Sequence, residues 1–429
     1  MMLKSRFDVV IGNPPYAGFH GLTKEYKETL KHHYDCAAGR FDYYMPFIEM
    51  GLRLILRERC LVYICPSTFL KRDGGSALRQ LIRHGYGIRR IVDFGDQRIF
   101  ADALNYTGIY FFSSSQPESV LVQAGRYLQH ETLRLSDGSF RSDDLPGDGS
   151  MWFLPTGPAY RVWQTTRAGH FVKLGSVATI SEGIVTGCNE VFLMKRAKAS
   201  ELGIESDILY PCSRGSEVHP YVLDDPDDYL IYPYEPTTGR VIAENVMKQQ
   251  YPNAYRYLKS QRARLSGRDY FDQSGKECYE LWNERNIDNL MCDKIVVSEL
   301  GDRNSFALSR RGILYGDTVC GIVLRDAEIS PRGLVPILNS VFMNYYFRQL
   351  SVPKANNFII FKPLYLREIP LPRAVSDRDA RVLEEATQEL SDRQLSQTRR
   401  SNLQRDVDRI VFGMYSLLPD EVLAIGGTA

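Results

Sequence analysis

The sequence lacks the closely spaced pairs of metal-ligating and redox residues that define many small functional sites. Its eight cysteines are scattered along 429 residues, and no two of them form a Cys-x-x-Cys pair. Its seven histidines form neither a His-x-x-x-His nor a His-Glu-x-x-His pattern. We therefore expect no metal site and no disulfide framework, and the cysteine usage fits a reducing cytoplasm.

The sequence also lacks long apolar runs and an excess of charge of either sign. No uninterrupted apolar run is long enough to span a bilayer, so we expect no contact with a membrane. The stretch MMLKSRFD carries no small-residue cleavage site, so we expect no signal peptide. The 53 basic and 52 acidic side chains leave a net charge of +1, so any basic surface for a nucleic acid must be local.

The first part of the chain alternates short β-branched runs with helical patterns. Helical spacing is clear in DYYMPFIEMGLRLILR, residues 42–57, and in GSALRQLIRHG, residues 75–85. Buried strands are predicted at residues 7–12, 60–66, 88–95 and 106–112. This alternation predicts an α/β fold with βαβ units around a parallel sheet.

Changes in composition divide the chain into four parts. Residues 1–115 form the α/β part, and residues 116–170, rich in Ser, Gly, Pro and Asp, are predicted to be a connector. Residues 171–372 alternate short apolar pieces with polar turns, which predicts a mixed α+β domain with helices at 251–268 and 334–350. Residues 373–429 are charged and helical in pattern.

The sharpest motif is the tetrapeptide Asn13-Pro14-Pro15-Tyr16. It follows a predicted buried strand, so its side chains are expected at the carboxyl end of that strand, where open α/β sheets place their ligands. The alternative is an ordinary strand-ending turn, since Asn and Pro are common turn residues. By average residue usage the tetrapeptide arises by chance in about one in a thousand chains of this length.

The stretch FDVVIGNPPYAG, residues 7–18, resembles the catalytic motif of the methyltransferases that modify the exocyclic amine of adenine in DNA. The resemblance implies a site-specific adenine-N6 methyltransferase of a restriction–modification or phage-defence system. It implies S-adenosyl-L-methionine as the cofactor and double-stranded DNA as the substrate. It also implies that residues 1–115 hold the C-terminal half of a Rossmann-like methyltransferase sheet.

The resemblance assigns a role to each residue of the motif. The adenine amine is a poor nucleophile, and the Asn13 side-chain oxygen and the Pro14 carbonyl would each accept one of its hydrogens. This aims the nitrogen lone pair at the methyl group by positioning and electrostatics. Pro14 and Pro15 would stiffen the loop. The base must leave the duplex stack, and Tyr16 would offer it an aromatic face worth roughly 1–3 kcal/mol.

Two phenylalanines extend the resemblance beyond the motif. Phe100 aligns with the second aromatic residue that stacks on the flipped base. Phe47 aligns with an aromatic residue near the cofactor, which Asn13 and Pro14 would also contact. The alternative for either phenylalanine is an ordinary core residue.

Residues 173–372 resemble the TaqI-like specificity domain of restriction–modification methyltransferases, which reads the recognition sequence in the major groove. The resemblance rests on short motifs in the same order, among them LGSVATISEGIVTGCNEVFLM, residues 174–194, and KIVVSEL, residues 294–300. A basic run interleaved with tyrosines suits phosphate contacts, and a solvated helix face is the alternative. The predicted DNA-binding residues are Lys248, Arg256, Lys259, Arg262, Arg264 and Arg268.

The family pattern also includes a Gly-rich cofactor turn and an acidic residue after the second strand, and we find neither in this sequence. We therefore expect the C-terminal portion of a larger enzyme, whose first strand has an unpaired edge. A complementing N-terminal methyltransferase or nuclease polypeptide is an expected partner. The alternative function is that of a DNA-binding specificity subunit or an inactive fragment without turnover.

Overall fold

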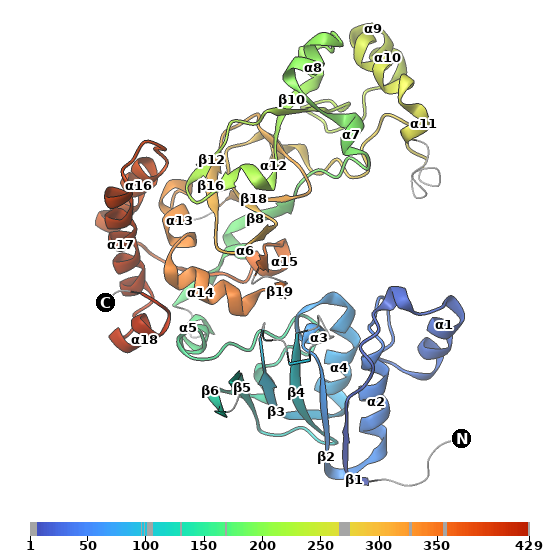
Figure 1. Cartoon of the computed structure of the whole chain (residues 1–429), viewed down its shortest axis with the longest axis vertical. Helices are drawn as coiled ribbons and strands as arrows, with labels where there is room; N and C mark the ends of the chain where they lie inside the picture. Colours follow the sequence, from blue (N-terminus) through green and yellow to red (C-terminus); the bar gives the residue numbers. More distant parts are fainter. Residues whose placement is uncertain are drawn as a thin grey trace. The chain divides into compact units, whose positions relative to one another are not determined.

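The computed structural model describes residues 7–427 apart from 96, 98, 101–105, 129–130, 168–169, 266–274, 326–327 and 355–357. The chain forms two compact units (Figure 1). The first contains Met1–Thr165 and Arg348–Phe358, and the second contains Thr166–Phe347 and Ile359–Ala429. Within the described ranges, no helix is long and apolar enough to cross a membrane.

The first unit is built on a six-stranded sheet with the order β1-β2-β4-β3-β5-β6. Its strands are β1 (Phe7–Gly12), β2 (Ile55–Pro66), β3 (Gly87–Asp93), β4 (Thr107–Ser113), β5 (Ser119–Leu128) and β6 (Glu131–Arg141). The prediction of a parallel sheet is wrong at β4, which pairs antiparallel with both β2 and β3. No helix lies between β3 and β4 in the described part of that connection, and strands joined without a crossover helix commonly pair antiparallel.

Five helices accompany this sheet: α1 (Lys24–His33), α2 (Tyr44–Leu54), α3 (Thr68–Lys71), α4 (Ser76–Gly85) and α5 (Pro158–Arg167). Helix α2 buries Met45, Ile48 and Leu52, whose spacing places them on one helical face. Pro46 is tolerated because it lies in the first turn, where its missing N–H has no helical acceptor. These side chains join a core that continues into β2, β3 and β4.

The prediction that the first strand is buried is wrong. Phe7, Val9 and Ile11 of β1 leave 43%, 54% and 77% of their surface exposed. Among the described strands β1 is outermost and pairs only with β2, in parallel, so the expected unpaired edge is present. Val10 points to the other face and packs on the core. The β-branched composition predicted the strand correctly, but the burial of a strand depends on what lies beside it.

The segment predicted as a connector, residues 116–170, adds structure to the first unit. Strand β5 pairs in parallel with β3, and β6 pairs antiparallel with β5. Trp152, which follows β6, is fully buried, and its indole N–H donates to the Pro146 carbonyl 3.0 Å away. The Ser-rich stretches that predicted a connector lie in the strands β5 and β6 and in the turns next to them.

The second unit is a mixed α+β body, as the sequence predicted, with two four-stranded sheets of order β17-β10-β13-β9 and β16-β14-β18-β8. Its strands, with β19 of the first unit, are β7 (Phe171–Lys173), β8 (Ala178–Glu182), β9 (Leu193–Lys195), β10 (Leu209–Ser213), β11 (Val218–His219), β12 (Val222–Leu223), β13 (Asp228–Ile231), β14 (Lys294–Ser298), β15 (Leu300–Gly301), β16 (Phe306–Ser309), β17 (Leu314–Tyr315), β18 (Val319–Leu324), β19 (Pro353–Lys354), β20 (Phe358–Ile360) and β21 (Pro370–Pro372). Its helices are α6 (Leu174–Val177), α7 (Asn189–Phe192), α8 (Arg196–Glu201), α9 (Glu244–Gln250), α10 (Pro252–Ser260), α11 (Arg262–Leu265), α12 (Ile287–Met291), α13 (Pro331–Leu338), α14 (Val341–Leu350), α15 (Pro363–Leu366), α16 (Asp377–Leu390), α17 (Gln397–Met414) and α18 (Pro419–Ala424).

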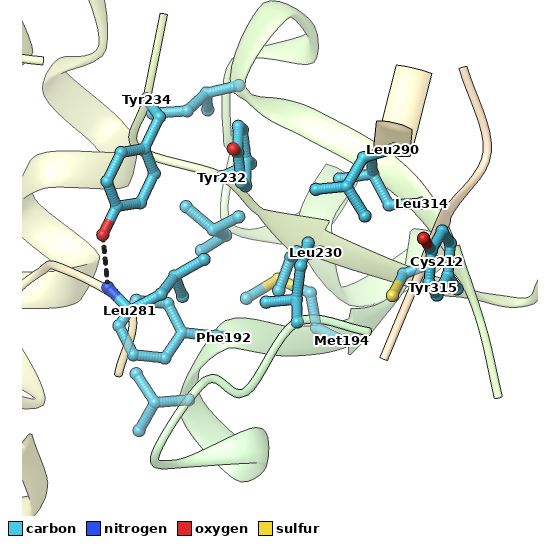
Figure 2. Close-up of a cluster of buried hydrophobic side chains, with 14 of the residues drawn as sticks. Phe192, Met194, Cys212, Leu230, Tyr232, Tyr234, Leu281, Leu290, Leu314 and Tyr315 are labelled. Carbon is cyan, nitrogen blue, oxygen red and sulfur yellow. Dashed lines mark hydrogen bonds between the residues drawn. The ribbon is translucent and has the colours of Figure 1, made fainter. Parts of the chain in front are cut away.

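A continuous apolar core supports the first of these two sheets. Figure 2 shows Phe192, Met194 and Leu230 packed together, with Tyr234 accepting a hydrogen bond from the Leu281 backbone N–H at 2.9 Å. The buried tyrosine hydroxyl thereby satisfies a buried amide, which would otherwise destabilise this core.

The helix predicted at 334–350 is two helices, α13 and α14, separated at Asn339 and Ser340. The Asn339 side chain accepts from the Phe306 N–H and donates to the Phe306 carbonyl, each at 2.8 Å. The Asp408 carboxylate accepts from the Val341 N–H at 2.9 Å and caps α14. Contacts with distant residues therefore break an apolar pattern that reads locally as one helix.

Candidate active site

The Asn13-Pro14-Pro15-Tyr16 loop begins at the carboxyl end of β1. Gly12 lies opposite Tyr63 in the β1–β2 register, and a Cβ atom on Gly12 would lie 2.9 Å from Tyr63 Cε1. The close approach of the Tyr63 ring explains the glycine at this position. After it, Asn13 is exposed and Pro14 is buried, so the strand end presents a polar side chain on a stiff, anchored loop.

Tyr16 is fixed to the neighbouring strand. Its hydroxyl donates to the Ile64 backbone carbonyl oxygen of β2, 3.2 Å away. Burial raises the pKa of Tyr16 well above its ordinary value, with a smaller contribution from Cys65, so the hydroxyl remains a proton donor at neutral pH. The hydrogen bond holds the half-buried ring at the end of the sheet.

Phe100 is the aromatic partner of Tyr16. The two ring centroids are 6.3 Å apart, and the ring planes are inclined by 65°. A base stacked between two aromatic faces needs a separation of roughly 7 Å, twice a van der Waals contact of ~3.5 Å. The structure brings together the two residues that the sequence predicted to hold the base, and one ring must turn for a base to enter.

A hydrogen-bonded turn positions the loop that carries Phe100. Asp93 ends β3, and its Oδ1 atom accepts from the Ser67 hydroxyl and from the Gly95 N–H, each at 3.1 Å. The Phe94 N–H donates to the Thr107 carbonyl of β4 at 3.3 Å. Asp93 therefore joins the end of β2, the end of β3 and the start of the Phe100 loop.

Phe47 on α2 packs against Tyr43, which in turn contacts Tyr26, and the sequence had not singled out either tyrosine. The Phe47 ring lies 5.0 Å from the Tyr43 ring at an angle of 89°. The Tyr43 and Tyr26 hydroxyls are hydrogen-bonded to each other, and this bond is the main cause that raises the pKa of Tyr43 to about 12. The Tyr43 N–H donates to the Ala17 carbonyl at 2.9 Å, which ties this cluster to the residue after Tyr16. The aromatic run DYYMPF was the available signal.

Five of the predicted DNA-binding residues lie on α9, α10 and α11 of the second unit: Lys248, Arg256, Lys259, Arg262 and Arg264. Glu244 Oε1 lies 3.4 Å from Lys248 Nζ and 3.2 Å from Lys259 Nζ. Its hydrogen bonds, first from Tyr255 and then from Lys259, lower the pKa of Glu244 to about 2. Much of the positive charge on these helices is therefore balanced locally.

The remaining members of the basic run differ in their surroundings. Arg264 pairs with Glu190, whereas the Arg256 guanidinium donates to the Asn253 side chain at 3.2 Å. Arg262 is exposed on α11, and Arg268 lies outside the described residues. Within the described ranges, no group of three or more His, Cys, Asp or Glu side chains could hold a metal ion.

Comparison with known proteins finds a similar family for a part of each unit. Residues 1–100 match the Eco57I restriction-modification methylase family, and residues 210–371 match the TaqI-like C-terminal specificity domain. The type II restriction enzyme and methyltransferase RM.Eco57I of Escherichia coli is 24% identical over 335 residues, 71% of this chain and 33% of the relative. The type II methyltransferase M.PaeR7I of Pseudomonas aeruginosa is 24% identical over 447 residues, 99% of this chain and 73% of the relative.

A further relative and a solved structure agree with these matches. The adenine-specific methyltransferase PglX of Streptomyces coelicolor is 23% identical over 410 residues, 83% of this chain and 32% of the relative. The structure of the type IIL restriction-modification enzyme MmeI in complex with DNA matches with a TM-score of 0.63 and 11% identity. The match covers 97% of this chain and 55% of MmeI, and it shows a common fold. This chain spans about a third of the length of RM.Eco57I and PglX.

The sheet with its Asn-Pro-Pro-Tyr loop lies in the stretch that matches the methylase family, and the mixed second unit holds most of the stretch that matches the specificity domain. The chain is therefore similar to type II restriction–modification methyltransferases in both stretches, at identities of 24% with RM.Eco57I and with M.PaeR7I.

Proposed function

We propose that this chain carries the catalytic loop and the target-recognition domain of a DNA adenine-N6 methyltransferase in a restriction–modification or phage-defence system. The observation that carries the proposal is the loop at the end of β1. It combines an exposed Asn13, a buried Pro14 and a Tyr16 ring fixed to β2 and facing Phe100.

The residues of this loop account for the activation of the amine. The Asn13 side-chain oxygen and the Pro14 carbonyl oxygen accept the two amine hydrogens of a flipped adenine, which localises the nitrogen lone pair. Tyr16 and Phe100 hold the ring of the base, so that it cannot return to the duplex stack. No residue needs to act as a strong base in this step, because positioning and fixed dipoles supply the effect.

The proposed cofactor is S-adenosyl-L-methionine, which supplies the methyl group when bound. Helix α2 packs against β1, so the exposed Asn13 amide and the partly buried Phe47 ring belong to neighbouring elements. An amide and an aromatic face suit the polar and cationic parts of such a cofactor. Asn13, Pro14 and Phe47 are the residues of this chain that we expect to contact it.

Further partners follow from the two units. We propose that residues 171–372 read double-stranded DNA, with Lys248, Arg256, Lys259, Arg262, Arg264 and Arg268 contacting phosphates. The exposed apolar face and open edge of β1 support a complementing polypeptide that pairs with this strand. The eight cysteines are all free thiols, which supports action in the reducing cytoplasm.

Asn13→Ala tests this function in the chain supplied with its complementing polypeptide. Because it removes one of the two amine acceptors, we expect transfer of labelled methyl groups to duplex DNA to fall by roughly 10²–10³-fold. DNA affinity, measured by fluorescence anisotropy, should stay unchanged. Asn402→Ala on α17 is the matched control and should retain full activity.

Two outcomes would contradict the proposal. Full methyl transfer by the Asn13→Ala protein would remove Asn13 from the reaction. Tight, specific DNA binding by the unaltered complex without any methyl transfer would instead favour a DNA-binding specificity subunit.

A further inference from the structure

Tyr43, which immediately precedes α2, is the point where three parts of the first unit meet. Its backbone N–H donates to the Ala17 carbonyl oxygen 2.9 Å away, and Ala17 directly follows Tyr16. Its ring packs edge-on against the Phe47 ring, with the centroids 5.0 Å apart and the planes inclined by 89°. Tyr43 therefore contacts both the end of the candidate catalytic loop and the aromatic ring that we propose for the cofactor.

Tyr26 of α1 contacts Tyr43 through both its hydroxyl and its ring. The two hydroxyls are hydrogen-bonded to each other, and the ring centroids lie 5.5 Å apart with the planes inclined by 67°. The bond to Tyr26 is the main cause that raises the pKa of Tyr43 to about 12, so the Tyr43 hydroxyl stays protonated at neutral pH. The two side chains therefore join α1 to the start of α2.

A helix cap places Tyr26 in the first turn of α1. The Thr23 hydroxyl oxygen accepts from the Tyr26 N–H at 3.3 Å, and threonine is a preferred residue at the start of a helix. The next residue, Lys27, places its Nζ atom 4.2 Å from the centroid of the Phe19 ring. Phe19 in turn packs on the fully buried Phe41 at a centroid distance of 5.8 Å. The first turn of α1 is therefore anchored on the core at a second point.

We propose that Tyr43 is a positioning residue that holds the Phe47 ring and the chain after Tyr16 in one fixed arrangement. Tyr26 keeps Tyr43 in this arrangement. Methyl transfer requires the cofactor and the base to be held in a reactive geometry at the same time, and Tyr43 contacts an element that we assign to each. The role of Tyr43 in methyl transfer rests on the proposed function, whereas its attachment to α1 does not.

Hydrogen exchange of the full chain, measured on a peptide that covers Asp42–Met45, tests the attachment to α1 without any activity. Tyr26→Phe and Tyr43→Phe remove the same hydroxyl bond and keep both rings. The Tyr43 amide should exchange roughly fivefold faster in each variant, which is the effect of one lost hydrogen bond. The double variant should exchange no faster than either single variant, because both changes act on one bond.

Tyr160→Phe is the matched control for this measurement. Tyr160 lies in the same unit and its hydroxyl donates to the Ser139 carbonyl, so this variant also loses a tyrosine hydroxyl and its bond. It should leave the exchange of the Asp42–Met45 peptide unchanged. Tyr26 is 41% exposed, so Tyr26→Phe is expected to fold. Unchanged exchange of the peptide in Tyr26→Phe would overturn the proposal that Tyr26 holds Tyr43.

Steady-state kinetics of the complemented enzyme tests the role of the Tyr43 ring. Tyr43→Leu removes the ring that packs on Phe47, so the KM for S-adenosyl-L-methionine should rise roughly two- to tenfold, the range expected for one aromatic pair. The KM for DNA should stay constant. Tyr43→Phe keeps the ring and should restore most of the affinity for the cofactor.

Three outcomes separate this positioning role from its alternatives. An unchanged KM for the cofactor in Tyr43→Leu, or an equal rise in Tyr43→Phe, would contradict the role of the ring. A lower kcat with both KM values unchanged would contradict it as well, because a smaller folded fraction alone produces that result. If the unaltered complemented enzyme transfers no methyl group, the proposed function fails, and hydrogen exchange still decides whether Tyr26 holds Tyr43.

Discussion

The Tyr16 hydroxyl donates a hydrogen bond to the Ile64 backbone carbonyl, so the residue at the end of the Asn-Pro-Pro-Tyr loop is tied to the adjacent strand. Tyr16→Phe keeps the aromatic face and loses only this bond, whose net value is about 1 kcal/mol, so methyl transfer should fall roughly fivefold. Tyr16→Ala removes the face as well and should cost a further ~1–3 kcal/mol. Methyl-transfer rates and the fluorescence of a 2-aminopurine target measure both effects. Equal losses in the two variants would show that the ring face does not hold the base.

The Tyr63 ring of β2 lies close to the backbone of β1 at Gly12. The Cβ atom of Gly12→Ala would approach Tyr63 Cε1 to 2.9 Å, so the ring or the strand must shift. We expect the free energy of unfolding to drop by about 1–3 kcal/mol, as in other overpacked cores. Urea denaturation measures this change.

The control for Gly12→Ala removes the ring that causes the clash. Tyr63→Leu alone will destabilise the protein, but adding Gly12→Ala to it should cost much less than in the parent. Strictly additive costs in this double-mutant cycle would show that Tyr63 is not the residue that excludes a side chain from position 12.

Asp408 makes the stability of the second unit depend on pH. Burial raises the pKa of Asp408 from 3.8 to about 6 in the folded protein, although the hydrogen bond from the Val341 N–H opposes this shift. The folded state therefore binds the proton more tightly than the unfolded state. The resulting stability is fully present below pH ~4 and is lost as the pH rises through ~6.

Asp408→Asn keeps an oxygen acceptor for Val341 and removes the charge. We expect this variant to gain roughly 1–3 kcal/mol of stability at pH 7 relative to the parent, and to lose the slope between pH 4 and 6. Urea unfolding at several pH values measures both. A difference from the parent that is the same at pH 4 and pH 7 would rule out titration of Asp408 as the cause.

Glu244 controls how much charge α9 and α10 offer to DNA. Because it pairs with Lys248 and Lys259, Glu244→Gln should free both lysines, tighten DNA binding and steepen its dependence on salt. Lys259→Met should weaken binding uniformly across DNA sequences and reduce the slope of log K against log salt by about 0.9. Lys31→Met serves as a control outside these helices. If neither Glu244→Gln nor Lys259→Met alters the slope of log K against log salt, these helices do not contact phosphates.

Local patterns predicted some parts of the chain well and misplaced others. The spacing of Met45, Ile48 and Leu52 predicted α2 because a helical face depends only on neighbours three and four residues apart. The strand at Phe7–Gly12 was also predicted, but the prediction that it is buried is wrong. The β5–β6 pair was missed because outer strands tolerate the polar composition that also marks loops.

In the candidate site too, the sequence predicted some features and the tertiary structure alone decided others. The resemblance of the Asn13-Pro14-Pro15-Tyr16 motif to a methyltransferase family implied an amine-binding loop, and that role stays a prediction. The sequence could not show that Phe100 touches Tyr16, because the two residues meet through separate strands. Nor could it predict Tyr43 and Tyr26 beside the loop, because their pairing depends on how α1 folds back.

By itself, the sequence determined the elements that depend on neighbouring residues and the chemical groups at the end of β1. Tertiary structure alone decided which strands are covered, which charges are balanced, and which distant segments meet. Lys71 reaches Gln349 and Ser351 across more than half of the chain, and Glu244 gathers lysines from two helices. A buried charge is costly unless it is paired or hydrogen-bonded, so such contacts stabilise the folded chain. The partner can lie far away in the sequence, and a local sequence pattern therefore cannot predict it.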